Sequence, residues 1–240
     1  MPALGPLGLR VAVYADGAVL QDMISAYRGG LVSGFTTNPT LMAKAGLTDY
    51  AGFGREVVAA IPDLPISFEV FADDFPSMAQ QARRIATWGR NVFVKVPIMN
   101  TKRESALPLV RQLSSEGIKL NVTAVMGLDQ VRGIVAAVSP RVPAIVSIFA
   151  GRIADTGRDP VPHMSEAVSL CRARPELQVL WASPREVLNV YQADECGCHI
   201  ITVTPDLLGK LTLRDKDLDD YSRDTVQMFY DDARQAGFSV

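Results

Sequence analysis

The chain lacks the features of several classes of protein. It has no window of about eighteen apolar residues, and its first ten residues, MPALGPLGLR, lack the basic and long apolar regions of a secretory signal. It has no long basic run, and its net charge is -2 with a pI near 5.7. We therefore expect a cytoplasmic protein whose partner is a small molecule, with no nucleic acid and no membrane.

Cysteine and histidine are also scarce. Cys171, Cys196 and Cys198 provide neither the number nor the spacing of a zinc site or a disulfide framework. We interpret them as reduced, mostly buried thiols, and His163 and His199 as structural residues. The sequence has no HExxH motif, no Asp-rich loop and no histidine cluster. We therefore expect no metal and no other cofactor.

What the chain has in quantity is apolar residues arranged in short runs. At 240 residues and 48% hydrophobic, it can form one large core, and we expect a single domain over residues 1–240. Eight runs have the β-branched, apolar character of buried strands. These runs cover residues 11–16, 31–37, 65–71, 91–97, 119–125, 144–151, 177–183 and 198–204.

Amphipathic segments separate these runs. Those at 74–88, 102–116, 128–138, 162–173 and 184–193 are each long enough for a crossover helix. Strand and helix alternating eight times is the pattern of a closed (β/α)8 barrel of the TIM type, a fold of the α/β class. Residues 218–236 indicate an extra helix after the barrel, with an acidic start that suits a helix N-terminus.

The segment NVFVKVPIMNT, residues 91–101, places a lysine in a buried strand. Val94 and Val96 flank Lys95 directly, so the ammonium group would lose hydration. Burial can lower a lysine pKa by several units from about 10.4, which gives a neutral amine that can attack a carbonyl. Two interpretations stay open. Lys95 is either a Schiff-base nucleophile or a structural lysine paired with a glutamate.

Polar residues occur at the carboxyl ends of the predicted strands, where barrel enzymes place their chemistry. A period of two puts the members of each pair on one strand face, and we expect these faces to point toward Lys95. A hydrogen-bonded cap is the commoner role for any one of them, but seven strand ends are hard to assign to capping alone. The pairs are Ser67 with Glu69, Asn121 with Thr123, Ser147 with Phe149, and Trp181 with Ser183, and Asp16, Thr36, Thr37 and Asn38 end the first two strands.

These residues stand in motifs that resemble the transaldolase family, including its close relatives the fructose-6-phosphate aldolases. The motifs are YADGA around Asp16, GFTTNPTL at 34–41, FVKVP at 93–97, NVTA at 121–124, SIFAGRIAD at 147–155 and ASPR at 182–185. They occur in the order of the family and span nearly the whole chain. The resemblance implies sugar phosphate substrates and a lysine imine mechanism that needs no metal.

The resemblance also implies a role for each matching residue. Lys95 would form the imine, Asp16 would act as general base, and Glu69 and Thr123 would hold a proton-shuttling water. The substrate-binding residues would be Asn38, Asn121 and Ser147 for the hydroxyls of the three-carbon fragment, Phe149 beside the enamine, and Arg152, Ser183 and Arg185 for the phosphate. Guanidinium groups suit that last role because they bind phosphate oxygens bidentately.

The resemblance leaves several functions open. The first is transfer of a dihydroxyacetone unit between sugar phosphates, in the pentose phosphate pathway or in a pathway that makes a longer sugar. The second is an aldolase that releases free dihydroxyacetone, but aldolase-type members carry glutamine and tyrosine where this chain has Glu69 and Phe149. A third is a silent barrel that binds sugar phosphate, which would not need the four catalytic residues together. A homo-oligomer is possible, as in short members of the family.

The chain departs from the common family pattern at three positions. Pro184 stands where many relatives have an aromatic residue, and Trp181 is bulky for a strand end that we expect to face the substrate. Gly17 follows the aspartate in place of a small hydroxyl residue. The first two differences bear on the acceptor or phosphate pocket and leave the imine chemistry unchanged.

Overall fold

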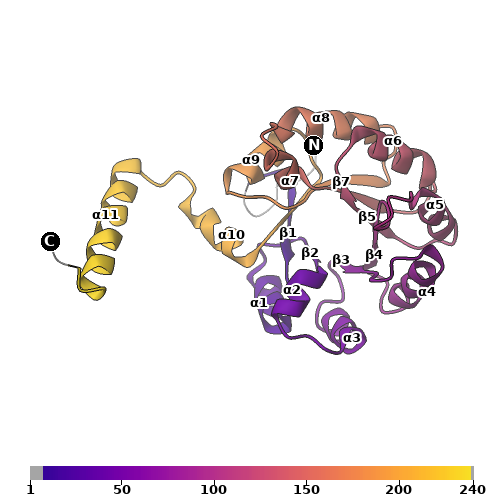
Figure 1. Cartoon of the computed structure of the whole chain (residues 1–240), viewed down its shortest axis with the longest axis horizontal. Coiled ribbons are helices and arrows are strands. Elements are labelled where there is room, and N and C mark those ends of the chain that lie inside the picture. The colour runs from indigo at the N-terminus through magenta and orange to yellow at the C-terminus, as the bar shows by residue number, and fades with distance from the viewer. Residues whose placement is uncertain (1–7, 239–240) are drawn as a thin grey trace. The chain divides into compact units, whose positions relative to one another are not determined.

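The computed structural model describes residues 8–238, and within them eight parallel strands close into a barrel with helices such as α4, α5 and α8 outside it (Figure 1). The predicted (β/α)8 fold is confirmed, because every strand pairs in parallel with its neighbours in chain order and β8 pairs with β1. The strands are β1 (Ala12–Asp16), β2 (Gly34–Thr36), β3 (Ile66–Glu69), β4 (Val92–Pro97), β5 (Leu120–Val125), β6 (Ala144–Ile148), β7 (Leu177–Trp181) and β8 (Ile200–Val203).

Both faces of the strands are buried, which explains the continuous apolar runs. One face fills the barrel interior, where Ile145, Leu180 and Ile200 pack in a cluster with Tyr14 and Phe93. The opposite face packs under the helices. The interior cluster fills the barrel toward the amino ends of the strands, so the polar residues further along the same strands face the open carboxyl end.

The helices were predicted less completely than the strands. They are α1 (Leu20–Gly29), α2 (Pro39–Lys44), α3 (Tyr50–Ala60), α4 (Phe75–Ala86), α5 (Leu107–Ser115), α6 (Leu128–Ala137), α7 (Ala150–Ala154), α8 (Pro160–Cys171), α9 (Leu188–Glu195), α10 (Pro205–Lys210) and α11 (Leu218–Gln235). The start of α4 was predicted at its cap. Asp74 accepts a hydrogen bond from Ser77 N at 2.8 Å, and proline follows in the first turn of α4.

Several predicted boundaries were wrong by three residues or more, and two of them show the reasons. The run at 144–151 is too long as a strand, because β6 ends at Ile148 and α7 begins at Ala150. The helix predicted from residue 102 begins at Leu107, because a bridge between Met99 and Ser105 holds the preceding loop in an extended hairpin. At residues 149–151 the apolar pattern continues through the change of backbone conformation, whereas residues 102–106, KRESA, include one apolar residue and do not mark where the helix begins.

The expectation that Trp181 faces the substrate was also wrong. Leu180 packs in the barrel interior, so Trp181 points away from it toward the helices, where it is fully buried. Ser183 does not share its face, because β7 ends at Trp181 and Ser183 has a positive φ of 60°. The two residues were paired by a period that stops at the strand end.

The chain divides into two compact units, one up to Leu208 and one from Gly209. The second contains α11, which confirms the predicted extra helix, and α11 has no buried residue. The single domain over residues 1–240 stays a prediction. Among the helices of the described residues, none combines the length and apolarity needed to span a bilayer.

Candidate active site

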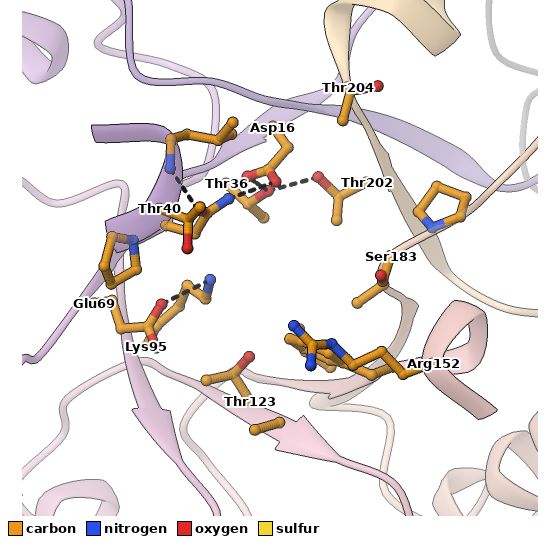
Figure 2. A pocket seen from close by; sticks show the side chains of 18 of the residues that line it. Asp16, Thr36, Thr40, Glu69, Lys95, Thr123, Arg152, Ser183, Thr202 and Thr204 are labelled. Atoms are coloured by element: carbon orange, nitrogen blue, oxygen red, sulfur yellow. Dashed lines mark hydrogen bonds and ion pairs between the residues drawn. The ribbon is translucent and has the colours of Figure 1, made fainter. Parts of the chain in front are cut away.

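A cavity of about 480 Å³ opens at the carboxyl ends of the strands. Figure 2 shows Lys95 and Glu69 on one side of it, Arg152 and Ser183 on the other, and Asp16 between these groups beside Thr36. The lining also includes Asn38, Thr123, Ser147, Phe149, Pro184, Arg185, Thr202 and Thr204. Of the eleven site residues expected from sequence, Asn121 alone is outside the lining.

Lys95 lies in β4 with its side chain turned inward to the cavity, and it is only 7% exposed. Its Nζ donates a hydrogen bond to the Thr37 carbonyl at 2.8 Å and forms an ion pair with Glu69 Oε2 at 3.1 Å. The lysine has a glutamate partner and borders the cavity, so the geometry leaves both interpretations from sequence open. Because the amine borders the cavity, a carbonyl compound can reach it.

Asp16 ends β1, and each of its carboxylate oxygens has one donor. Thr36 Oγ1 donates to Oδ1 at 2.8 Å, and Asn38 Nδ2 donates to Oδ2 at 2.8 Å. Burial raises the pKa of the Asp16 carboxyl, and Glu69 raises it slightly, while Lys95 and the two hydrogen bonds lower it. A fixed carboxyl with a raised pKa, beside a buried amine, can take and return protons.

Asn38 is fixed by the helix that follows it. Its Oδ1 caps α2 by accepting from Leu41 N at 2.9 Å, which leaves its amide N–H groups toward Asp16. Proline at the next position fixes the first turn of that helix. The GFTTNPTL motif therefore sets the orientation of the aspartate through a helix cap.

Thr202 was missed in the sequence. It lies on β8, lines the cavity, and its hydroxyl is 2.6 Å from that of Thr36. The strand pattern of the sequence could have indicated it, because Ile200 faces the barrel interior and the period of two puts Thr202 on the same face. Thr36 was noted at a strand end, but its contact with Asp16 was not predicted.

Asn121 lies below the cavity, where it supports Ser147. Its Nδ2 donates to Ser67 Oγ at 3.0 Å, and its Oδ1 accepts from Ser147 Oγ at 2.6 Å. The amide is completely buried and both of its groups are engaged, and its expected contact with a substrate hydroxyl stays a prediction. Thr123 differs: it lines the cavity, and its buried hydroxyl has no hydrogen-bond partner. A water or substrate atom in the cavity would satisfy it.

Two arginines line the cavity, and Arg152 stands on the side opposite Lys95 (Figure 2). The Arg152 guanidinium lies 5.6 Å from the centroid of the Phe149 ring, which also lines the cavity. Arg185 forms an ion pair with Asp155, with Nε at 3.1 Å from Oδ1. This pair lowers the pKa of the Asp155 carboxyl. Two guanidinium groups with the Ser183 hydroxyl form a wall that could bind an anion.

The residues of this wall are brought together by a close contact between the backbone at Gly151 and the backbone at Ser183. A Cβ on Gly151 would lie 1.6 Å from the Ser183 carbonyl oxygen, so a residue with a side chain cannot stand there without movement. The Gly151 N–H also points to the Ala182 carbonyl at 3.4 Å. Glycine in the GRI motif therefore allows α7, which carries Arg152, to pack against the segment that carries Ser183.

His199 has structural surroundings. His199 Nδ1 accepts a hydrogen bond from Val179 N at 3.0 Å, and burial lowers its pKa. Within residues 8–238, no three His, Cys, Asp or Glu side chains gather as a metal site would require. The absence of a cofactor stays a prediction.

Sequence comparison bears on the chemistry of this cavity. The family model for transaldolase/fructose-6-phosphate aldolase matches residues 13–240. The chain belongs to this family. A probable transaldolase of Dehalococcoides mccartyi is 36% identical over 192 residues, which cover 80% of this chain and 85% of that protein. One of Thermoanaerobacter sp. strain X514 is 32% identical over 95% of this chain and 99% of its own length.

Solved structures of a distant protein share the fold. The crystal structure of KGPDC from Streptococcus mutans has a TM-score of 0.55 with 12% identity, and covers 81% of this chain and 87% of the other. At that identity the likeness supports the barrel and nothing finer. Membership of the transaldolase/fructose-6-phosphate aldolase family, with relatives named as probable transaldolases, makes the protein an enzyme of the aldolase type.

Proposed function

We propose that the protein transfers a dihydroxyacetone unit from a ketose phosphate to an aldose phosphate through an imine on Lys95. The observation that supports this most is the buried Lys95 amine beside a cavity that also holds Asp16, Glu69 and Thr123. These four groups come from four different strands, β1, β3, β4 and β5, so their convergence needs more than capping.

The first chemical step is imine formation. The Lys95 amine attacks the C2 carbonyl of the ketose, and the carbinolamine then loses water. Glu69, 3.1 Å from Nζ, can take the ammonium proton and return one to the departing hydroxyl. Thr123 has a free buried hydroxyl on the same cavity wall, where it can hold the water that carries these protons.

Carbon-carbon cleavage and formation follow. Asp16 takes the proton of the C4 hydroxyl, the bond between C3 and C4 breaks, and its electrons move into the protonated imine to give an enamine. An aldose phosphate leaves. The acceptor aldehyde enters, the enamine attacks it, and Asp16 returns the proton to the new hydroxyl. Arg152, Ser183 and Arg185 would hold the phosphate of donor and acceptor in turn.

Transfer is favoured over release of dihydroxyacetone by Glu69 and Phe149. Both line the cavity, and the Phe149 ring carries no proton to give to the enamine. Phe149→Tyr should raise acceptor-independent release of dihydroxyacetone from fructose 6-phosphate by about tenfold. A variant with no increase would contradict the assigned role of Phe149.

Borohydride trapping tests the imine directly. Wild-type protein treated with fructose 6-phosphate and borohydride should carry a reduced adduct on Lys95, found in the tryptic peptide 91–102 because trypsin does not cleave at the modified lysine. Lys95→Ala should lose the adduct and more than about 10³-fold in turnover. Lys119→Ala is the matched control, since Lys119 Nζ donates to the Arg90 carbonyl outside the cavity lining.

The acceptor decides between the remaining activities. Turnover that depends on an added aldose phosphate supports the transferase, and free dihydroxyacetone at the same rate without acceptor supports the aldolase. A series of aldose phosphates of increasing length then tests whether the product is an unusual longer sugar. Pro184, at the cavity wall beside Ser183 and Arg185, is placed to influence that choice. Failure of wild-type protein to form any adduct would leave a sugar phosphate binder.

A further inference from the structure

Two cysteine thiols lie in contact outside the cavity. Cys196 follows the last residue of α9, Cys198 precedes β8, and Gly197 between them has a φ of +79°. This conformation suits glycine and turns both side chains to the same side. The two sulfur atoms are 3.5 Å apart and share a hydrogen bond.

The two thiols have different surroundings. Cys196 is half-buried and donates to the Ala193 carbonyl at 3.6 Å, whereas Cys198 is buried at 4% exposure. Because Cys196 donates its own hydrogen bond to the Ala193 carbonyl, it is the acceptor in the hydrogen bond with the Cys198 thiol. That hydrogen bond lowers the pKa of the Cys196 thiol and raises that of Cys198, and burial raises the Cys198 pKa further. Cys196 is therefore the better nucleophile and the more accessible one.

We propose that Cys196 and Cys198 form an oxidation site that a hydroperoxide converts to a disulfide. The Cys196 thiolate attacks one peroxide oxygen, the O–O bond breaks, and Cys196 becomes a sulfenic acid while the other oxygen leaves as alkoxide, or as hydroxide from hydrogen peroxide. The Cys198 sulfur then attacks the Cys196 sulfur and displaces the sulfenic acid oxygen as hydroxide, and the S–S bond forms. Two thiols are oxidised and one hydroperoxide is reduced, with the thiol protons carried off in the water and alcohol formed.

The third cysteine provides an internal comparison. Cys171 is 2% exposed and ends α8, and burial raises its pKa to about 11. Among the described residues, no hydrogen bond joins Cys171 to another thiol, and the residue is buried. The same peroxide should therefore leave Cys171 reduced, although all three residues are free cysteines.

Mass spectrometry of native wild-type protein tests the oxidation site. After treatment with hydrogen peroxide, blocking with iodoacetamide and trypsin digestion, both thiols fall in peptide 186–210 and Cys171 falls in peptide 159–172. Peptide 186–210 should lose two hydrogen atoms and resist alkylation until dithiothreitol is added. Peptide 159–172 should be alkylated throughout. Native protein should form the disulfide about tenfold faster than protein in guanidinium chloride, because folding holds the thiols together.

Two outcomes would overturn this assignment. One is peptide 186–210 alkylated at both cysteines after oxidation, and the other is a rate no faster in native than in unfolded protein. Cys198→Ser should stop at the sulfenic acid on Cys196, which a dimedone adduct reports, and Cys171→Ser should behave as wild type. Because wild-type protein alone decides the outcome, a variant that fails to fold does not affect it. The test needs no turnover and is independent of the proposed function.

A second observation concerns the hydroxyl chain that ends on Asp16. An ionised carboxylate only accepts, so Thr36 uses its one proton on Asp16 Oδ1 at 2.8 Å. The Thr202 hydroxyl, 2.6 Å from that of Thr36, must then be the donor between the two. With its proton committed, Thr202 presents only lone pairs to the cavity it lines.

Protonation of Asp16 reverses this chain. Asn38 donates to Oδ2 and cannot turn, because its Oδ1 caps α2, so the acid proton belongs on Oδ1 beside Thr36. The acid then donates to Thr36, Thr36 donates to Thr202, and the Thr202 proton is free to point into the cavity. The other charged groups that act on Asp16 are Lys95, which favours its ionised form, and Glu69, which disfavours it.

We infer that Thr202 is a positioning residue whose polarity follows the protonation of Asp16; this rests on the proposed function. Before cleavage, the single proton of the donor's C4 hydroxyl points to Asp16, so Thr202, which then only accepts, makes no hydrogen bond to that oxygen. After Asp16 has taken that proton, the same oxygen is an aldehyde carbonyl, and Thr202 can donate to it. Thr202 thus donates to the reacting oxygen only after the proton has moved to Asp16, which favours the cleaved state.

Thr202→Val keeps the shape of the side chain and removes the hydroxyl. We expect kcat for transfer to fall by about 10- to 100-fold, and the acid limb of the kcat/KM profile to move to higher pH because Thr36 becomes a weaker donor to Asp16. Borohydride trapping on Lys95 should persist, and Thr202→Ser should restore both kcat and the profile. A role confined to packing would instead leave the pH profile in place.

A direct titration separates this inference from the proposed function. Carbon-13 NMR of the Asp16 carboxyl needs no turnover, and its pKa should be higher in Thr202→Val than in wild type. An unchanged carboxyl pKa overturns the inference even if the protein is a transaldolase. Failure of wild type to form the Lys95 imine, with the carboxyl pKa shifted as expected, overturns the proposed function and leaves the coupling in place.

Discussion

At the scale of the residue, the site is made of groups whose position costs stability. Asp16 is held at the cavity wall by two hydrogen bonds, yet burial raises its pKa. Lys95 is buried with Glu69 as its partner. Such arrangements lower the stability of the fold, because the same side chains would be better hydrated in the unfolded chain, and they provide reactive groups at the cavity.

Asp16→Ala should separate stability from activity. An acid with a raised folded-state pKa favours the folded state below its unfolded pKa, and this contribution is lost as pH rises through the folded pKa. At pH 7 the variant should therefore be inactive and more stable than wild type by about 1 kcal/mol, with the gain shrinking toward about pH 4. Urea denaturation at both pH values measures this.

The control for this prediction is Asp129→Ala, whose side chain is 99% exposed. It should show no gain that depends on pH in this way. An Asp16→Ala variant that is less stable than wild type at pH 7, with the deficit growing as pH rises, would contradict the sign of the argument.

Arg152→Ala tests the phosphate wall. Because the guanidinium faces the cavity opposite Lys95, its loss should raise KM for phosphorylated substrates by about 10- to 100-fold and change kcat little. Steady-state kinetics with fructose 6-phosphate and with an unphosphorylated donor gives the comparison. Arg55→Ala, on the exposed side of α3, should be neutral. An equal loss on both substrates would reject the phosphate role.

At the scale of the element, the join between α7 and the segment after β7 is the tightest contact of the site. Gly151→Ala would place a Cβ 1.6 Å from the Ser183 carbonyl oxygen, and a backbone atom cannot rotate away as a side chain can. We expect a loss of about 1–3 kcal/mol in unfolding free energy and a raised KM for phosphorylated substrates, because Arg152 and Ser183 separate.

Thermal denaturation and steady-state kinetics check this result. Gly29→Ala in α1 is the matched control, since its Cβ would meet no atom within 4 Å. It should leave both stability and KM close to wild type. A Gly151→Ala variant with wild-type stability would mean that α7 moves freely, and the close approach would lose its significance.

At the scale of the whole molecule, α11 presents apolar side chains to solvent. Val226 and Phe229 are both 62% exposed, and they lie one turn apart on the same face. The homo-oligomer stays a prediction, and this face is a place to test it. Val226→Glu with Phe229→Glu should lower the sedimentation coefficient if copies of the chain associate through it.

Gln227→Glu with Arg234→Glu changes the other face of α11 and controls for added negative charge. It should sediment as wild type. A wild-type protein that sediments as a monomer at all concentrations would reject the homo-oligomer, and an unchanged oligomer in the apolar-face variant would place the interface elsewhere. Neither variant alters a buried residue, since α11 has none.

The sequence by itself determined the barrel and most of the cavity wall. Buried parallel strands leave continuous β-branched runs, and the period of two along each strand fixes which polar side chains share a face. That is why Lys95, Asp16, Glu69 and Thr123 could be expected together, and why all four line one cavity.

Only the tertiary structure decided the contacts between strands distant in the chain and the directions taken where strands end. No local pattern reports that Thr202 meets Thr36 across β8, β1 and β2, or that Asn121 is held below the cavity by Ser67 and Ser147. The period also stops at the strand end, which is why Ser183 does not share the outward face of Trp181. Hydrogen bonds across the barrel depend on register and closure, which the whole sheet sets at once.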